Sequence, residues 1–524
     1  MAYVITQSCC NDATCILECP VDCIRPTPGD PEFFSAEMLY IDPDSCIDCG
    51  ACQDACPVSA VYPEDELPPH LRHFAEFNAG YFHMHPLEPS DHFGTRPAKP
   101  AADRGVLRVA VVGSGPAAAY LAEDLLERGN VKVDMLERLP TPWGLLRSGV
   151  APDHLSTKDL AGLFDRAFKS DAFEYHLNVE VGRDLSIEEL CTSHHAVVLA
   201  TGAADPVQWD VPGADLPGVH PATDFVAWYN GHPDHADATF DLSCERAVII
   251  GNGNVALDVA RILLLGPDEL KASDIAEHAR EALASSQIRE VVIAGRRGPL
   301  DAAYTIGEFY ALANLRGLDV VIEGARDCAP GPEASYEDGL KAELTAKFAA
   351  AEPTGADRRV VFRFFAETAE VLGDERVEGV RFLRDDLVDD AGLVLTSIGY
   401  RSREIPGVPF DEARGTIPHD EGRVLPGLYT VGWAKRGARG GIGAGRADAQ
   451  ETAAAIVADF NGGVLTASGA DLAEILALKD VLVVTSDGWT AIDAHERATG
   501  AETGRPRKKL VRVEQMLRVA RSSH

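Results

Sequence analysis

The sequence lacks a long hydrophobic run. Among its 524 residues, no apolar stretch approaches the roughly 18 residues that a membrane-spanning helix needs. The first ten residues, MAYVITQSCC, carry neither a basic segment nor the apolar core of a secretory signal peptide. We therefore expect no membrane span and no secretion, and we expect the protein to be cytoplasmic.

Basic residues are scarce as well. Lys and Arg number 48 against 82 Asp and Glu, which gives a net charge of -34. Such a charge excludes binding of nucleic acid or of an anionic membrane through the whole surface, and it suits a protein that meets basic partners. The deficit is greatest at the N-terminus, where Arg25 is the only base in residues 1–60.

Cysteine is unevenly distributed. Nine of the 12 cysteines lie in the first 56 residues, and the three others are expected to be ordinary small buried residues: Cys191, Cys244 and Cys328. A secreted disulfide-rich domain was one alternative for the first group. The spacing of the cysteines and the large, ordinary remainder of the chain disfavour it.

The second cysteine run has the spacing C-x₂-C-x₂-C-x₃-C-P, from Cys46 to Pro57. In this pattern three closely spaced thiolates hold one iron–sulfur cluster and the fourth reaches the other cluster of a pair. A zinc knuckle would instead need two separated C-x₂-C pairs. The run therefore predicts iron–sulfur ligation.

The first run follows the same register but has Asp12 in place of its second cysteine. Because the fourth cysteine of each run reaches the cluster of the other run, the two runs predict one complete [4Fe–4S] site and one site with three thiolates. We favour [3Fe–4S] for the second, and the alternative is a [4Fe–4S] cluster with Asp12 as a ligand to a labile fourth iron. Cys10 remains an alternative to Cys9, and Cys23 is expected to be a bystander. The predicted ligands are Cys19, Cys46, Cys49 and Cys52 for [4Fe–4S], and Cys9, Cys15 and Cys56 for [3Fe–4S].

Residues 1–62 resemble the bacterial seven-iron ferredoxins, through VITQSC, ECPVDCI and MLYIDPDSCIDCGACQDACPVSAV. The resemblance implies a small α+β fold with pseudo-twofold symmetry, whose hairpins enclose two clusters.

After a segment rich in Pro and His, residues 63–105, the pattern changes to alternating strands and helices. The segment is expected to be a linker that packs irregularly. A strand over 106–112 leads into the turn GSGPAA and a helix, and Glu137 ends the next strand over 131–137. Gly113 permits the tight turn, Gly115 lets a pyrophosphate approach, and the acid accepts from ribose hydroxyls. This unit predicts an FAD site.

A second unit begins with a strand over 246–250 and the turn GNGNVA. Its following strand ends not in an acid but in Arg296 and Arg297. Paired guanidinium groups suit a 2′-phosphate, so this unit predicts NADP(H).

Residues 106–524 resemble the adrenodoxin reductase family, through PWGLLRSGVAPDH, GRRGPLDAAYTIGEF and GLYTVGWAKRGARGGI among other stretches. The resemblance implies two sets of contacts. For FAD, together with the turn, they are Gly113, Gly115, Ala117, Glu137, Leu145, Val181, Trp433, Gly440, Gly441 and Ile442. For NADP(H) they are Asn252, Gly253, Asn254, Val255, Arg296, Arg297, Glu308 and Gly440.

Two further features have alternative interpretations. Asp153 and His154 are acid–base candidates, although hydride transfer to a flavin needs no side-chain acid, so structural hydrogen bonds near the flavin are the favoured interpretation. The C-terminal basic run GRPRKKLVR is expected to be a solvated tail or, alternatively, a docking surface for the acidic N-terminal domain.

The expected architecture is multidomain: an α+β two-cluster domain (1–62), a linker (63–105), and an α/β flavoprotein with two Rossmann-like domains. The flavoprotein comprises an FAD-binding domain (106–205 and 401–524) and an NADP-binding domain (206–400). The predicted function is a fused ferredoxin–NADP⁺ reductase that takes electrons from NADPH to an acceptor protein such as a P450 or another ferredoxin. The alternatives are the same chain run in reverse, and a relay subunit like that of glutamate synthase. The sequence does not predict the oligomeric state.

Overall fold

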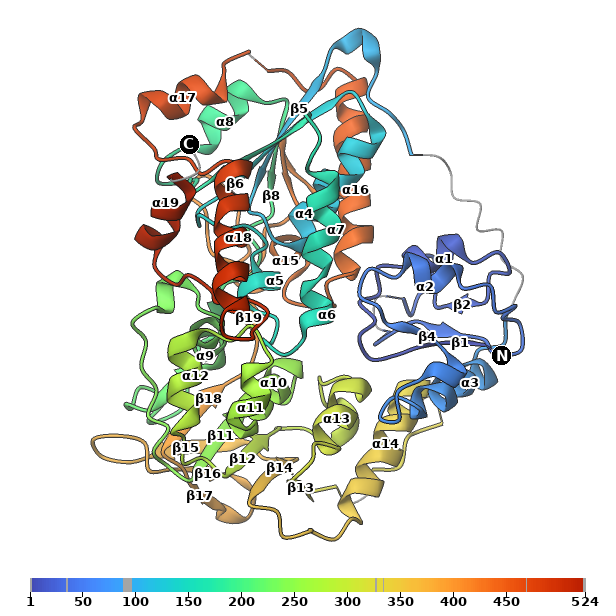
Figure 1. Ribbon diagram of the computed structural model, residues 1–524, viewed down its shortest axis with the longest axis vertical. Helices are drawn as coiled ribbons and strands as arrows, with labels where there is room; N and C mark the ends of the chain where they lie inside the picture. The colour runs from blue at the N-terminus through green and yellow to red at the C-terminus, as the bar shows by residue number, and fades with distance from the viewer. Residues whose placement is uncertain are drawn as a thin grey trace.

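The computed structural model describes residues 2–33, 36–87, 97–325, 328–332, 334–467 and 469–521. We divide it into an N-terminal unit (residues 2–87), a first α/β domain (107–205 and 401–521) and a second α/β domain (206–400), as Figure 1 shows. No helix in the described ranges is long and apolar enough to cross a membrane.

The N-terminal unit consists of two copies of one motif. A position in the first copy corresponds to the position 37 residues later in the second copy. Strand β1 (Tyr3–Ile5) pairs with β4 (Val61–Pro63), and β2 (Ile24–Arg25) pairs with β3 (Tyr40–Ile41), both antiparallel. Two short helices, α1 (Thr14–Glu18) and α2 (Ala51–Ala55), begin after left-handed residues, Ala13 with φ 61° and Gly50 with φ 79°. Both helices end at a cysteine with an extended backbone, so the two loops have the same local shape.

The segment expected to pack irregularly contains a helix, α3 (His73–Met84). Its Asn78 is buried, accepts hydrogen bonds from the amides of Ile5 (3.1 Å) and Ile41 (2.9 Å), and donates to the carbonyl of Ile5 (2.8 Å). The side-chain amide of Asn78 therefore joins α3 to both strand pairs of the unit. The helix belongs to the N-terminal unit, so residues 73–84 of the segment are regular, contrary to the expectation.

The first domain has a six-stranded sheet in the order β20-β21-β8-β5-β6-β7. The expected strands are present as β5 and β6, paired in parallel, and the expected helix is α4, which starts with a proline and ends before Gly129. The strands are β5 (Leu107–Val112), β6 (Val131–Glu137), β7 (Phe173–Leu177), β8 (Ala196–Leu199), β20 (Arg423–Leu425) and β21 (Leu428–Thr430). The helices are α4 (Pro116–Arg128), α5 (Leu145–Ser148), α6 (Leu155–Lys158), α7 (Leu160–Ala167), α8 (Ile187–Ser193), α15 (Trp433–Arg436), α16 (Ala444–Asn461), α17 (Leu472–Leu478), α18 (Ser486–Ala501) and α19 (Val513–Arg521).

The second domain repeats the design with the order β10-β18-β11-β12-β14-β13, all parallel. Its strands are β10 (Val219–Pro221), β11 (Arg246–Ile250), β12 (Glu290–Ala294), β13 (Leu318–Glu323), β14 (Arg358–Arg363) and β18 (Leu393–Thr396). Its helices are α9 (Ala222–Tyr229), α10 (Asn254–Leu264), α11 (Pro267–Lys271), α12 (Glu277–Ala284), α13 (Ile306–Ala313) and α14 (Tyr336–Ala349). A small antiparallel sheet adds β15 (Thr368–Leu372), β16 (Gly379–Phe382) and β17 (Val388–Asp390).

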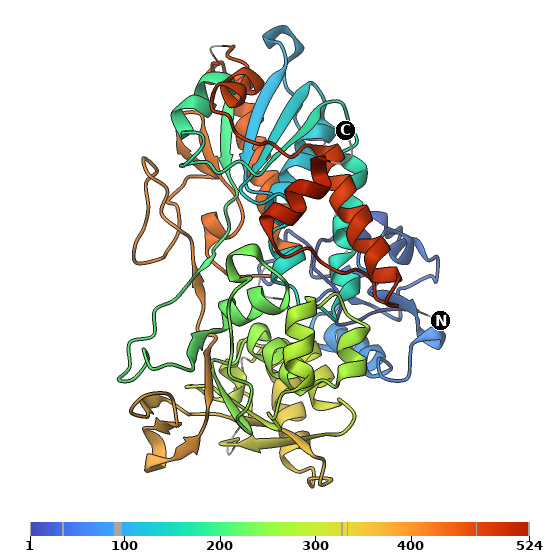
Figure 2. The same cartoon turned by 60° about the vertical axis from the view of Figure 1, so that its left-hand side comes forward.

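The two α/β domains lie one above the other (Figure 2), and β9 (Asp205–Pro206) pairs with β19 (Tyr400–Arg401) where the chain crosses between them. The C-terminal segment also joins them. Arg505 is buried and pairs with Glu277 at 2.5 Å, and the ammonium of Lys509 lies 3.0 Å from Asp274 and 3.2 Å from the carbonyl of Arg147. Both expectations for the basic run were therefore wrong, because acids of both α/β domains pair with its charges; Arg507 pairs with Asp493 and Glu496 of α18.

The N-terminal unit shares its hydrophobic interior with both α/β domains. One core cluster contains Ile5, Met38 and Phe74 together with Ile306 and Phe309 of the second domain. Another contains Val58 and Ala60 together with the strands and helices of the first domain. The unit is therefore packed against the rest of the chain as a part of one structure.

Candidate functional site

The first glycine turn lies at the carboxyl end of β5, where α4 begins. Gly113 has φ 103°, and a Cβ there would lie 2.5 Å from the carbonyl oxygen of Ala200, so only glycine fits. The Glu137 carboxylate accepts from the amide (3.2 Å) and hydroxyl (2.7 Å) of Ser114. The acid at the end of β6 is thus held beside the turn, and the free amides of α4 point where a pyrophosphate can bind.

The remaining predicted FAD residues gather around the beginning of α4. A Cβ on Gly432 would lie 2.5 Å from the Ala117 Cβ, so α15 and its Trp433 pack tightly on α4. Leu145 begins α5 directly after Gly144, which contacts Gly115. Val181 follows Val179, whose amide donates to the Glu137 carbonyl at 2.8 Å. Gly440, Gly441 and Ile442 form the loop that leads into α16, which packs along α4.

The second glycine turn repeats this arrangement at the carboxyl end of β11. Gly251 has φ 110°, and a Cβ there would lie 2.1 Å from the carbonyl oxygen of Ser397. Gly253 caps α10, which starts at Asn254 and continues through Val255. The Asn252 side chain lies against Gly295, at the end of β12, so the turn is next to the exposed Arg296 and Arg297. The predicted NADP(H) residues of the turn and of the strand end are therefore brought together.

Asp153 and His154 join a buried charge network between the two domains. The Arg261 guanidinium lies 2.7 Å and 3.2 Å from the Asp153 carboxylate and 3.3 Å from Glu308, and it donates to the His154 Nε2 at 2.7 Å. Burial alone would raise the pKa of Asp153, but Arg261 lowers it below its ordinary value. His154, Asp258 and Glu308 could hold a cation by spacing alone, but the guanidinium already provides the positive charge. Asp153 and His154 thus make hydrogen bonds with Arg261 inside the protein.

The second cysteine run lines a small pocket in the N-terminal unit. The four thiols predicted for [4Fe–4S], together with Cys23, surround it: Cys19, Cys46, Cys49 and Cys52. The Cys23 and Cys19 sulfurs are 3.5 Å apart, and the hydrogen bond from Cys23 lowers the pKa of Cys19. A set of converging thiols around an otherwise apolar pocket suits an iron–sulfur cluster. The position of Cys23 beside Cys19 differs from its expected role as a bystander, and its spacing of four residues from Cys19 is the signal in the sequence that it lies nearby.

The thiols of Cys9, Cys15 and Cys56 form the second group. Burial raises the pKa of Cys15, and the charges of Cys9 and Cys56 raise it further. Burial raises the pKa of Cys9 to about 12, so a bound cation is needed to keep this sulfur a thiolate at neutral pH. Asp12 is buried beside these thiols. None of the 12 cysteines, all of which lie in described residues, forms a disulfide, so the disulfide-rich alternative is wrong.

Comparisons with known proteins match both parts of the chain. The family model "4Fe-4S binding domain" matches residues 39–62, and "Pyridine nucleotide-disulphide oxidoreductase" matches residues 107–293. A "probable ferredoxin/ferredoxin–NADP reductase" of Mycobacterium leprae is 46% identical, over 99% of this chain and 98% of its own length. The chain belongs to the ferredoxin/ferredoxin–NADP reductase family. The predicted fold class is confirmed, as are an iron–sulfur ferredoxin domain and the relation to adrenodoxin reductase, and the disfavoured zinc knuckle is not supported.

The α/β part of this reductase has related proteins of its own. The human mitochondrial "NADPH:adrenodoxin oxidoreductase" is 40% identical, over 82% of this chain and 93% of its own length. The solved structure of Mycobacterium tuberculosis FprA in complex with NADPH is 41% identical, with a TM-score of 0.76, over 79% of this chain and 99% of FprA. The adrenodoxin reductase resemblance is thus matched by a structural likeness.

Proposed function

We propose that this chain is an NADPH-dependent flavin oxidoreductase, a ferredoxin–NADP⁺ reductase that carries its own ferredoxin and delivers electrons to an external redox protein. When bound, FAD accepts a hydride and returns electrons singly, and iron–sulfur clusters carry single electrons. One observation carries the proposal. The Cys10 carbonyl, beside the three-thiol group, accepts a hydrogen bond of 2.8 Å from the amide of Gly443, at the end of the predicted flavin loop.

The two dinucleotides are held by the two turns. FAD binds at Gly113 and Gly115, with its pyrophosphate on the amides that open α4 and its ribose at Glu137. The predicted contacts of Ala117, Leu145, Val181, Trp433 and the Gly440–Ile442 loop surround the same end of α4. NADPH binds at the turn over Asn252–Val255, with Glu308 and Gly440 as further contacts.

Arg296 and Arg297 recognise the 2′-phosphate of NADPH. Both are exposed at the end of β12, next to the Asn252 side chain, and β12 does not end in the acid that a 2′-hydroxyl would need. Guanidinium groups bind phosphate with paired hydrogen bonds. The arrangement favours NADPH over NADH.

The N-terminal unit holds two clusters. Cys19, Cys46, Cys49 and Cys52 hold [4Fe–4S], and Cys9, Cys15 and Cys56 hold [3Fe–4S]. Cys9 is favoured over Cys10 because Cys9 occupies the position in the first run that Cys46 occupies in the second. The three-iron form is favoured over a four-iron cluster with Asp12 as ligand, because the Asp12 oxygens already accept from protein donors. A reducing compartment such as the cytoplasm preserves these free thiols.

The test is anaerobic rapid mixing of the loaded protein with NADPH, with the flavin and iron–sulfur absorbance followed separately. We expect the flavin band to bleach first, the iron–sulfur bands to follow within the same molecule, and an iron content of about seven per chain. A flavin that bleaches while the iron–sulfur bands never respond would contradict the proposal. A one-electron protein acceptor, such as a P450 or a second ferredoxin, should then reoxidise the chain.

A further inference from the structure

The repeat in the N-terminal unit allows its two cysteine loops to be compared position by position. A shift of 37 residues places Cys9 on Cys46, Cys10 on Ile47, and Asp12 on Cys49. The backbones agree, because Asn11 and its counterpart Asp48 both have a left-handed conformation, with φ 59° and 57°. Asp12 therefore lies at the edge of the three-thiol group that corresponds to the edge of the four-thiol pocket where Cys49 lies.

These equivalent edges are in different surroundings. In the second loop Ile47 is 57% exposed and Cys49 is exposed. In the first loop Cys10 is half-buried and Asp12 is only 7% exposed. The first edge is covered by the reductase and the second edge faces solvent.

The cover is the loop that leads into α16. A Cβ on Gly443 would lie 2.1 Å from the Cys10 carbonyl oxygen and 2.3 Å from the Asp12 amide nitrogen. The two backbones touch with no side chain between them. This contact places the three-thiol group directly behind the predicted flavin loop.

The Asp12 carboxylate is directed to protein groups. Its Oδ1 accepts from the Thr14 amide at 3.3 Å, and its Oδ2 lies 3.4 Å from the Arg446 guanidinium of α16. The Thr14 hydroxyl donates to the same Oδ2 and accepts from Arg446. The carboxylate thus joins the first cysteine loop to the reductase by a charge-assisted bond of low exposure.

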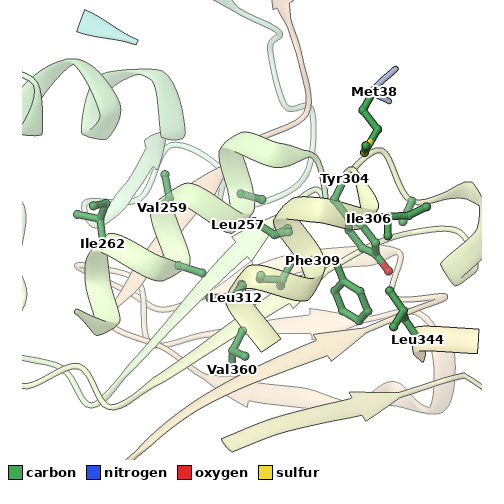
Figure 3. Packing of buried hydrophobic residues seen from close by; sticks show 14 of the residues in the cluster. Met38, Leu257, Val259, Ile262, Tyr304, Ile306, Phe309, Leu312, Leu344 and Val360 are labelled. Carbon is green, nitrogen blue, oxygen red and sulfur yellow. The ribbon is translucent and has the colours of Figure 1, made fainter. Parts of the chain in front are cut away.

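A second anchor lies on the other side of the unit. Met38 points towards Ile306 and Tyr304 (Figure 3), and a Cβ on Gly307 would lie 2.6 Å from the Gln7 Cβ. The Glu37 carboxylate lies 3.0 Å from the Lys341 ammonium and accepts from the Ile306 amide at the start of α13. With the unit held at two places on two domains, its orientation is fixed.

We propose that Asp12 is a docking residue and not an iron ligand. Its pair with Arg446 seats the N-terminal unit in one orientation, with the three-thiol group against the Gly440–Gly443 loop and the four-thiol pocket turned to solvent. A cysteine at position 12 would lose this pair, which explains the aspartate in the first run. The contact between Asp12 and Arg446 does not depend on the proposed function. The role of the orientation, which is to bring the three-thiol group next to the flavin, rests on the proposed function.

The first test is hydrogen–deuterium exchange of the full, loaded chain in the peptide that contains the Gly443 amide. We expect Arg446→Ala to speed this exchange roughly tenfold or more, since a hydrogen bond to a charged group is lost. Arg446→Lys should restore most of the protection, because it keeps the charge. Arg497→Ala, which removes an exposed pair with Asp493 on α18, is the matched control and should leave the peptide unchanged. Exchange of the Arg446→Ala protein equal to the unmodified chain would overturn the proposal.

The second test separates docking from ligation. Asp12→Ala should show the same faster exchange while it keeps its iron content and the electron paramagnetic resonance signal of the three-iron cluster. Loss of iron or of that signal in Asp12→Ala, with Arg446→Ala fully loaded, would show instead that Asp12 is a ligand. If NADPH fails to reduce the unmodified chain, the proposed function falls, while the exchange comparison still decides the docking.

Discussion

At the carboxyl end of β12, two exposed arginines replace the acid that ends β6. Arg297 lies 3.5 Å from Asp301, with its side chain 60% exposed, so its charge remains available to a ligand. Glu137, by contrast, is held against Ser114 in the first turn. The two strand ends differ in charge at equivalent places, and this difference supports the proposed assignment of FAD to the first domain and NADP(H) to the second.

The double change Arg296→Ala with Arg297→Ala should raise the KM for NADPH roughly 10- to 100-fold, because two charge-assisted contacts to the 2′-phosphate are lost. The KM for NADH should barely change. Steady-state kinetics with an artificial acceptor measures both. Arg316→Ala, an exposed arginine after α13, is the control, and equal losses for the two nucleotides would contradict phosphate recognition.

Asp274 supplies a pH-dependent contribution to stability. It is buried between the ammonium groups of Lys158, at 2.7 Å, and Lys509, at 3.0 Å. Burial alone would raise its pKa, but the two ammonium groups lower the pKa from 3.8 to about 2. A lowered pKa means that the contribution is fully present above pH 3.8 and is lost as the pH falls through about 2.

Asp274→Asn should therefore destabilise the protein by about 3–5 kcal/mol at pH 7, because two buried charges lose their partner. The deficit should stay constant from pH 7 to about 4 and shrink only in stronger acid. Thermal unfolding over this range measures it. Asp268→Asn, an exposed acid in the first turn of α11, should change the midpoint little, and a deficit that disappears already near pH 6 would refute the argument.

At this scale the sequence predicted single residues well where a local pattern defines them. The strands over 131–137 and 246–250 were predicted to the residue, and the thiols of the second run surround one pocket. Contacts across the chain were not predictable. Arg446 meets Asp12 from 434 residues away, and the basic C-terminal run is neutralised by acids far upstream, such as Glu277. A local pattern carries no information on such partners.

Among the elements, the loop before α16 leaves no room for a side chain at Gly443. Gly443 has an ordinary helical backbone, so the need for glycine comes only from the first cysteine loop against it. Helix α3 was missed for a related reason, since its aromatic residues and Asn78 are buried by the hairpins and by the second domain. The conformations of the loop before α16 and of α3 therefore depend on contacts with segments that are distant in the sequence.

Gly443→Ala should push the first cysteine loop away, at a cost of about 1–3 kcal/mol for the overlap of a methyl group with a backbone. Exchange in the peptide over residues 9–15 should rise roughly tenfold. Gly445→Ala is the matched control two residues on, because its Cβ would have its nearest neighbours at 3.6 Å and 3.7 Å, an ordinary contact. Similar exchange in both variants would remove the steric argument.

Over the whole molecule, the four-thiol pocket of the N-terminal unit has an exposed edge, which would give the proposed external acceptor access. Val21, Ile47 and Cys49 line the four-thiol pocket and are exposed. Asp48 and Asp54 are exposed nearby, and their charges act on Tyr3 of the same pocket. An apolar centre with an acidic rim suits a basic redox protein.

Asp48→Asn with Asp54→Asn should lower the second-order rate of reduction of a basic haem protein, such as cytochrome c, about two- to fivefold at low salt. The difference should vanish near 1 M salt, where the screening length is about 3 Å. Reduction of the chain by NADPH should not change. Asp374→Asn with Glu375→Gln, in the turn between β15 and β16, controls for net charge, and an equal effect there would exclude a local surface.

The hydrophobic interior that the N-terminal unit shares with its neighbours limits how hybrids of this enzyme can be made. A foreign ferredoxin spliced in front of residue 97 would bring a water-adapted exterior against Ile306 and Phe309, which here are covered by Met38 and Phe74. Transplants that carry over α3 and the Met38 side of the unit should keep this apolar contact, whereas those that exchange the first cysteine run would also lose the pair of Asp12 with Arg446.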